Sequence, residues 1–225
     1  MESTQSLRIH GRKYGARSLS LRGGLVLVVL WVALAVVGVS NVFATSNLFT
    51  SNIFCHVTPP QLGCAIDSAA VLEYDGTTGA FVRTFVQPGS GGLDSPGGLV
   101  FGPNGNLFMS SGSTFNSSSS VVNSVLEYNG ATGAFVRIFV PTGSGGLAQP
   151  YALAFGPNGN LFLSTKLQET VLEYNGTTGA FVRTFVQPNS GGLTDPHGMA
   201  FGPNGNLFVG SVVSIGTTGV FEYDG

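Results

Sequence analysis

Short apolar runs separated by turns rich in glycine, asparagine and proline fill most of the chain after residue 70, and they predict β-strands. In one unit these runs are Tyr151–Phe155, Asn160–Thr165, Thr170–Tyr174 and Ala180–Val186. The first two flank Gly-Pro-Asn-Gly, in which Asn-Gly is a strong hairpin signal because both residues accept a positive φ. The last two flank Asn-Gly-Thr-Thr-Gly. Each unit is therefore predicted to hold four antiparallel strands joined by hairpins.

The unit is repeated along the chain. The segment FGPNGNLF occurs three times, and the tyrosines that end the third strand of successive units are 54, 46 and 49 residues apart: Tyr74, Tyr128, Tyr174 and Tyr223. Periods of about 40–50 residues with several strands are typical of β-propeller blades. A parallel β-helix is the alternative. We expect an all-β fold, a β-propeller of four-stranded antiparallel blades with about three to four blades.

The first and last units are incomplete. The chain begins its repeats with a third and fourth strand within Val71–Val86, and its last unit has no fourth strand. Asn47–Phe49 is a candidate second strand for a worn first blade. Closed propellers have about four to eight blades. The ring is therefore predicted to be incomplete or open, with self-association through open blade edges as one outcome.

Composition and charge exclude one class of partner. The chain is 43% hydrophobic and only 9% charged, well below the roughly 25% of charged residues in soluble domains. From Thr45 onward, four cationic residues face ten carboxylates, which gives a net charge of −6. Nucleic-acid binding requires a basic surface, so no nucleic-acid partner is expected.

The other cations precede an apolar run at residues 24–40, which is followed by Val42-Phe43-Ala44. This order predicts a secretory signal peptide cleaved after Ala44. The alternative is an uncleaved membrane anchor with the propeller outside the cytoplasm. We expect a leader at 1–44, a lead-in segment at 45–70 and propeller repeats at 71–225, in a secreted, periplasmic or otherwise extracellular protein.

Two cysteines, Cys55 and Cys64, lie in the lead-in segment. In an exported protein they are predicted to form a disulfide across a short loop. They lack the ligand count of a zinc site. Asparagines, rather than carboxylates, occupy the repeated turns, which argues against calcium. No metal and no cofactor is therefore expected.

Charged residues inside the repeat have a structural explanation. Glu173 and Arg183 are predicted to face each other across a hairpin, and the same pair recurs in the other units. A cross-strand pair contributes about 0.2–1 kcal/mol. A catalytic group is needed once, whereas these residues recur in each blade, so we interpret them as scaffold.

One position varies between units, and it gives the candidate site. The residue after the proline that precedes the first strand is Gly97, Tyr151 or His197. The first strand of a propeller blade is innermost, so these residues, with Asp195, are predicted to lie at the channel mouth and to bind a ligand. His197 is the single candidate catalytic residue. The other histidines, His10 and His56, lie outside the repeats, so no acid–base or metal constellation is predicted.

The sequence PHGMAFGPNGNLFV followed by VFEYDG resembles the NHL-type propeller repeat, and the resemblance covers nearly all of residues 71–225. It is similar to repeats of exported bacterial NHL proteins and of streptogramin (virginiamycin B) lyase. The resemblance implies a propeller, most often six-bladed, that acts as an interaction scaffold; a minority of members are metal-dependent enzymes. We expect an exported scaffold that binds a protein or carbohydrate. The alternatives are a degenerate lyase or lactonase-like enzyme and a truncated fragment of a longer propeller.

Overall fold

A computed structural model describes residues 47–56, 65–112, 123–214 and 217–225. These residues belong to one compact unit, Thr45–Gly225. The predicted leader, the side chain of Cys55, Cys64 and the serine-rich insertion at 113–122 lie outside what the structure describes, so the disulfide stays a prediction.

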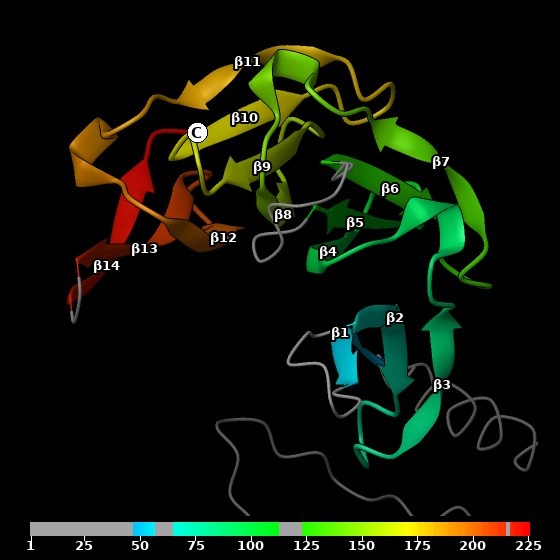
Figure 1. Ribbon diagram of the computed structural model, residues 1–225. Coiled ribbons are helices and arrows are strands. Elements are labelled where there is room, and N and C mark those ends of the chain that lie inside the picture. Colours follow the sequence, from blue (N-terminus) through cyan, green and yellow to red (C-terminus); the bar gives the residue numbers. More distant parts are fainter. Residues whose placement is uncertain (1–46, 57–64, 113–122, 215–216) are drawn as a thin grey trace, which may run out of the picture. The chain divides into compact units, whose positions relative to one another are not determined.

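The strands of this unit form four antiparallel sheets, which we call blades 1 to 4 (Figure 1). Blade 1 holds β1 (Leu48–His56), β2 (Ala65–Tyr74) and β3 (Phe81–Val86). Blade 2 holds β4 (Pro96–Phe101), β5 (Leu107–Ser111), β6 (Ser124–Tyr128) and β7 (Phe135–Val140). Blade 3 holds β8 (Pro150–Phe155), β9 (Leu161–Thr165), β10 (Thr170–Tyr174) and β11 (Phe181–Val186). Blade 4 holds β12 (Pro196–Phe201), β13 (Leu207–Ser214) and β14 (Thr217–Tyr223).

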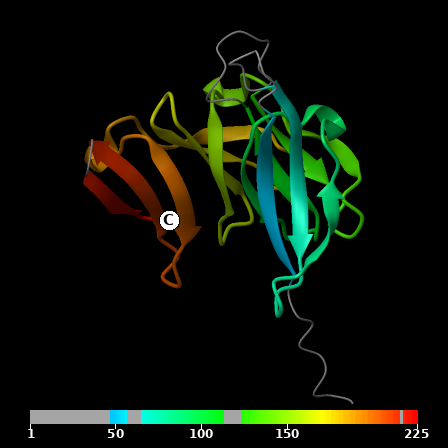
Figure 2. The same cartoon turned by 60° about the horizontal axis from the view of Figure 1, so that its bottom comes forward.

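Within each blade the strands follow one another in chain order, and neighbouring strands are antiparallel (Figure 2). A short 3-10 turn leads from each blade to the next: η1 (Ser90–Gly92), η2 (Ser144–Gly146) and η3 (Ser190–Gly192). The four-stranded propeller blade predicted from the repeat is confirmed. Between the described strands of blades 1 and 4 the ring of sheets is not closed.

Blade 1 contains the second strand that the sequence suggested. β1 pairs with β2 so that Leu48 lies opposite Tyr74, which is the register of Leu161 with Tyr174 in blade 3. The strand runs on from the expected Asn47–Phe49 to His56. Blade 1 therefore has the second, third and fourth strands of the unit, and blade 4 has the first three.

The first hairpin turn differs from the expected Asn-Gly turn. In blade 3, the amide of Gly159 donates to the carbonyl of Gly156, so Pro157 and Asn158 are the central residues of the turn. Gly159 follows them with a φ of 77°, whereas Asn158 has no positive φ. Proline favours the first central position because its ring fixes φ near −65°. The expectation that both Asn and Gly adopt a positive φ was wrong, because the proline shifts the turn by one residue.

Successive blades share hydrophobic cores. The core between blades 2 and 3 joins Phe108 and Phe139 to Leu161 and Tyr174. Burying a side chain of this size contributes about 1.5–3 kcal/mol. The hydroxyl of Tyr174 also donates to the carbonyl of Ser144, 2.8 Å away, and Tyr128 and Tyr223 make the same bond one blade earlier and one blade later. Each blade is thus fixed to the turn that precedes it.

Helices contribute little to the described part of the chain, and none of them is long and apolar enough to cross a membrane.

Candidate functional site

The three residues that follow the blade prolines lie in a row on neighbouring strands. β4, β8 and β12 pack against one another as the first strands of their blades. A side chain at Gly97 would lie about 3.1 Å from the carbonyl oxygen of Tyr151. The Tyr151 ring in turn contacts the His197 ring edge to face, with centroids 5.1 Å apart. The structure therefore brings together the positions that vary between the repeats.

Gly97 has a structural role in this row. A Cβ at this position would lie 2.7 Å from the hydroxyl oxygen of Ser110. That hydroxyl donates to the carbonyl of Tyr151 at 2.7 Å, which ties β5 to the next blade. Gly97 thus allows close packing and offers no side chain to a ligand.

Lys166 completes the site and was not anticipated from the sequence. Its ammonium lies 4.2 Å from the centre of the Tyr151 ring, 3.0 Å from Nε2 of His197 and 3.5 Å from Oδ1 of Asp195. We call Tyr151, Lys166, Asp195 and His197 the mouth cluster. One signal was available: Lys166 is the only lysine after the leader, and the corresponding residues of blades 2 and 4 are Gly112 and Val212.

The contacts of His197 define its tautomer. Because a lysine ammonium can only donate, Nε2 of His197 accepts its hydrogen bond. The proton of the neutral ring then lies on Nδ1, which is 2.8 Å from the carbonyl oxygen of Asp195 and donates to it. Both ring nitrogens of His197 are therefore occupied within the cluster.

Asp195 supplies the exposed acceptor of the cluster. Its side chain is 46% exposed, against 18% for Lys166 and 37% for His197. Its φ of 38° is unusual for a residue with a side chain, but Ser95 and Gln149 have similar values at the same place in blades 2 and 3. Strain of this kind can mark a functional site. Here it recurs before each blade proline, so it belongs to the repeated scaffold.

The mouth cluster offers recognition chemistry. It presents two aromatic rings, one cation and one carboxylate, and parts of the Asp195 carboxylate and the His197 imidazole are open to solvent. Across the described residues, no three His, Cys, Asp or Glu side chains come close enough to hold a metal ion. Such a set can stack on a ligand and exchange hydrogen bonds with it.

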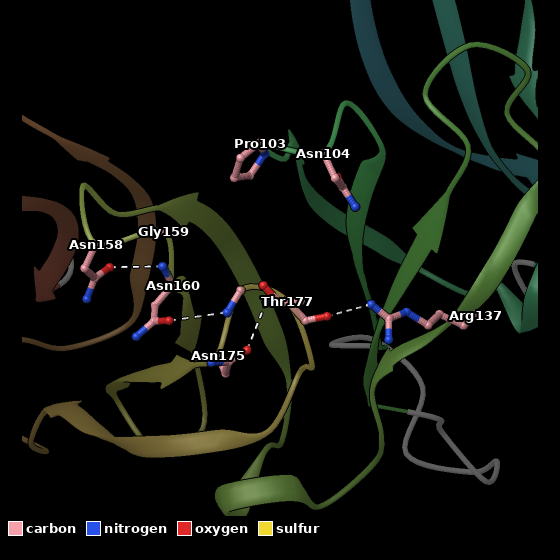
Figure 3. Close-up of a pocket in the computed structure, with 9 residues that line it drawn as sticks. Pro103, Asn104, Arg137, Asn158, Gly159, Asn160, Asn175 and Thr177 are labelled. Atoms are coloured by element: carbon pink, nitrogen blue, oxygen red, sulfur yellow. Dashed lines mark hydrogen bonds between the residues drawn. The ribbon is translucent and has the colours of Figure 1, made fainter.

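A cavity lies at the other end of the first strands. It has a volume of about 600 Å³ and is lined by turns of blades 2 and 3, including Asn158, Asn160 and Thr177 (Figure 3). Arg137 donates to the Thr177 carbonyl at 2.9 Å, and Asn175 accepts from the Thr177 amide at 3.0 Å. Its polar groups are thus already engaged with each other. Most of these lining residues also recur in the other units, whereas those of the mouth cluster do not, so we assign this cavity to the scaffold.

The predicted glutamate–arginine pairs form between the third and fourth strands of blades 1 to 3. Glu173 lies opposite Arg183, with 2.6 Å between Oε2 and Nε. Its other oxygen accepts from Asn158 at 2.9 Å and from Asn160 at 2.7 Å. Burial alone would raise the pKa of Glu173, but the bonds from Asn160, Arg183 and Asn158 outweigh it and lower that pKa. The turn asparagines therefore serve as donors to a carboxylate.

No family model and no curated protein sequence matches the chain. Among solved structures, a gluconolactonase from Xanthomonas campestris is similar, with 16% identity and a TM-score of 0.50 over 74% of this chain and 50% of that protein. A chain of a nidogen/laminin complex is also similar, with 21% identity and a TM-score of 0.43 over 64% of this chain and 48% of that chain. Virginiamycin B lyase from Staphylococcus aureus is similar with 15% identity and a TM-score of 0.42 over 68% of this chain and 48% of the lyase.

At these identities the likeness shows the fold alone. It confirms the propeller fold that the resemblance to NHL-type repeats implied. The chain spans about half the length of the gluconolactonase that it matches.

Proposed function

We propose that this chain is an exported binding propeller and that its ligand contacts the mouth cluster. The observation that carries the proposal is the convergence of Tyr151, Lys166, Asp195 and His197 from separate strands and turns. These residues do not recur from blade to blade. The repeated glutamates and arginines, in contrast, pair with one another. Variation on a repeated scaffold is the pattern expected of a recognition site.

The chemistry of the cluster favours a carbohydrate as ligand. Aromatic rings pack against the apolar faces of sugars, while Lys166 can donate to hydroxyl oxygens and Asp195 can accept from hydroxyl groups. A protein ligand with exposed polar side chains is the second possibility. Neither ligand requires a metal or a cofactor.

We expect Lys166→Met to weaken binding to a glycan that the wild-type chain recognises by about tenfold or more, because a hydrogen bond from a charged group contributes about 1.5–3 kcal/mol. A glycan array identifies the binder, and titration calorimetry measures its Kd. Leu167→Ala is the matched control, because this neighbour in the same turn is 67% exposed and takes no part in the contacts that define the mouth cluster.

Full retention of binding by Lys166→Met together with His197→Ala would contradict the proposal. The enzyme alternative has its own signature: turnover of a lactone or a streptogramin by the wild-type chain that is lost in His197→Ala. That outcome would replace a binding role by catalysis at the same cluster.

A further inference from the structure

Asparagine followed by glycine occurs five times in the repeats, in two kinds of turn. An asparagine side chain can lose its amide nitrogen when the backbone nitrogen of the next residue attacks its Cγ, and a glycine there has no Cβ to crowd the approach. The first kind of turn joins the first and second strands of a blade and holds Asn104, Asn158 and Asn204. The second kind joins the third and fourth strands and holds Asn129 and Asn175. The contacts of the two kinds differ, and only the second kind favours the attack.

In the second kind of turn, three donors surround the side-chain carbonyl oxygen. Oδ1 of Asn175 accepts from the amides of Thr177 and Thr178 at 3.0 and 2.9 Å, and from the Thr178 hydroxyl at 3.0 Å. Asn129 has the same three bonds, at 3.0, 2.9 and 3.0 Å. Negative charge develops on Oδ1 when a nucleophile adds to Cγ, and preorganised donors stabilise such an oxyanion. These turns therefore lower the barrier to addition at Cγ.

The side-chain nitrogen, which must leave, is held in the first kind of turn. Nδ2 of Asn158 donates to Glu173 at 2.9 Å, and its Oδ1 has a single donor among the described residues, the Asn160 amide. Asn104 and Asn204 donate to the glutamates of their own blades in the same way. In contrast, Nδ2 of Asn175 donates to no residue that the structure describes. The leaving nitrogen is thus restrained in the first kind of turn only.

The attacking nitrogen differs as well. The Gly159 amide donates to the carbonyl of Gly156 at 2.9 Å, a bond that closes the first kind of turn. The Gly176 amide donates to Oδ1 of Asn160 at 3.3 Å, beyond the usual range for an amide hydrogen bond. The Gly130 amide of blade 2 also has a 3.3 Å bond. Loss of the amide proton, which precedes the attack, therefore breaks a weaker bond in the second kind of turn.

Blade 1 already contains the product of this reaction. It has Asp75 at the position of Asn129 and Asn175. Oδ1 of Asp75 accepts from the amides of Thr77 and Thr78 at 3.0 and 2.7 Å, and from the Thr78 hydroxyl at 2.9 Å. These bonds, led by the one from the Thr78 amide, lower the pKa of Asp75. The turn therefore accommodates an aspartate with the same contacts as an asparagine.

We propose that Asn129 and Asn175 are deamidation sites, at which the turns of blades 2 and 3 are converted into the acidic turn of blade 1. In blade 3, the Gly176 nitrogen loses its proton to solvent and bonds to Cγ of Asn175. The Cγ–Nδ2 bond breaks, and Nδ2 takes up a proton and leaves as ammonia. Water then adds to the same Cγ and breaks its bond to the Gly176 nitrogen, which regains its proton and leaves an aspartate at position 175. The three donors to Oδ1 polarise the Cγ carbonyl for both additions.

Solvent reaches the reacting groups. Asn175 lines the polar cavity shown in Figure 3, and Asn129 is exposed. Conversion at both sites changes the net charge of residues 45–225 from −6 to −8. Neither asparagine belongs to the mouth cluster, and the proposal does not depend on the function proposed above.

The test follows all five Asn-Gly pairs in the full chain during incubation at pH 8, by peptide mapping and mass spectrometry. We expect the mass gain of an amide-to-acid exchange to appear at Asn129 and Asn175 at least about tenfold faster than in the first kind of turn, because donors stabilise the oxyanion only there. In concentrated urea, where the turns are lost, the five pairs should react at similar rates. Equal rates at the five pairs in the folded chain would overturn the proposal.

Thr178→Val tests the role of the donors. It removes the hydroxyl donor to Oδ1 of Asn175 and should slow deamidation there by about fivefold or more. Asn129 in the same molecule is the internal control and should react at the wild-type rate. Thr178 is exposed, so the variant is expected to fold, which circular dichroism checks.

Two further outcomes would contradict the proposal. One is deamidation at Asn175 that is as fast in Thr178→Val as in the wild type, because the donors would then not assist the reaction. The other is isoaspartate as the main product, identified by electron-transfer fragmentation, because the backbone of the turn would then differ from that of blade 1.

Discussion

At the scale of single residues, the repeated glutamates illustrate how a buried charge is retained. Glu173 is almost fully buried, yet its three hydrogen-bond donors satisfy both oxygens. Glu127 has the same set of partners in blade 2, and its pKa is lowered for the same reasons, against the raising effect of burial. A buried charge with all its partners is tolerated, whereas removing one partner leaves it uncompensated.

These carboxylates make stability depend on pH with a definite sign. Because the pKa of Glu173 is lower in the folded than in the unfolded chain, its contribution is fully present above the unfolded value and is lost as pH falls through the folded value. We expect Glu173→Gln to lower the free energy of unfolding at pH 7 by about 1–3 kcal/mol. It should also flatten the loss of stability below about pH 4.3, the ordinary pKa of glutamate.

Urea unfolding at pH 7 and pH 3 measures both effects. Glu222→Gln is the matched control, since this glutamate is exposed and has the same pair of asparagine donors, with no arginine partner among the residues that the structure describes. If Glu173→Gln and Glu222→Gln lowered the free energy of unfolding equally at pH 7, the ion pair of Glu173 with Arg183 would add no measurable stability.

The sequence predicted the Glu173–Arg183 pair but missed Lys166, and the difference is physical. Glu173 and Arg183 lie on two strands of one hairpin, so a short turn determines which residues face each other. Lys166 meets His197 across two blades, 31 residues apart in the chain. That distance depends on how blades pack, which local patterns do not encode. Tyr151, Asp195 and His197 were predicted together only because they share a place in the repeat.

At the scale of secondary-structure elements, the turn between the third and fourth strands also forms an interface between blades. Gly179 has a φ of 76°, and a Cβ there would overlap the carbonyl oxygen of Phe139 in the preceding blade. Gly79, at the same position in blade 1, has a φ of 71° and nothing within 4 Å. The two glycines thus share their backbone conformation and differ in their surroundings.

We therefore expect Gly79→Ala to destabilise the chain by about 1–2 kcal/mol, the penalty of a left-handed conformation. Gly179→Ala should lower the free energy of unfolding by about 1–3 kcal/mol more than Gly79→Ala does, because overpacking against the Phe139 carbonyl adds to the conformational penalty. The midpoints of urea unfolding measure the two losses of stability, provided that the m value, the dependence of the unfolding free energy on urea concentration, is unchanged. Equal losses would mean that the blades separate at this contact without cost.

Strands and their register were largely predictable, because the same apolar and turn residues mark each of them several times. The predicted Ala180–Val186 is observed as Phe181–Val186, and the predicted Thr170–Tyr174 is observed unchanged. The β1 strand was harder to define, since its repeat pattern is weak beyond Phe49. Its pairing with β2 comes from the tertiary arrangement of blade 1.

At the scale of the whole molecule, the repeated unit predicts the kind of fold but leaves open what completes it. Blade 1 holds the last three strands of the unit, and blade 4 holds the first three. Among the described strands, none fills the first position of blade 1 or the fourth position of blade 4.

Export is a prediction about the whole chain, and it rests on the basic and apolar pattern of residues 1–44. We expect expression in a secreting host to release a mature protein that begins at Thr45, because cleavage follows the small residue Ala44. Intact-mass spectrometry and N-terminal sequencing of the medium measure this. A full-length chain in the membrane fraction would instead support the anchor alternative.

The near identity of the blades also affects how the chain finds its fold. β6 and β10 share Val-Leu-Glu-Tyr, and β7 and β11 share Phe-Val-Arg, so pairing β6 with β11 would form the same ladder and the same ion pair as pairing it with β7. Side chains do not distinguish these pairings. Loop closure does, because the loop from Tyr128 to Phe181 is roughly ninefold longer than the loop from Tyr128 to Phe135, and closing it costs about 2 kcal/mol more. Correct strand pairing therefore depends on unbroken short turns. If one of these turns were cut by a protease, a strand of its hairpin could pair with the equivalent strand of a neighbouring molecule.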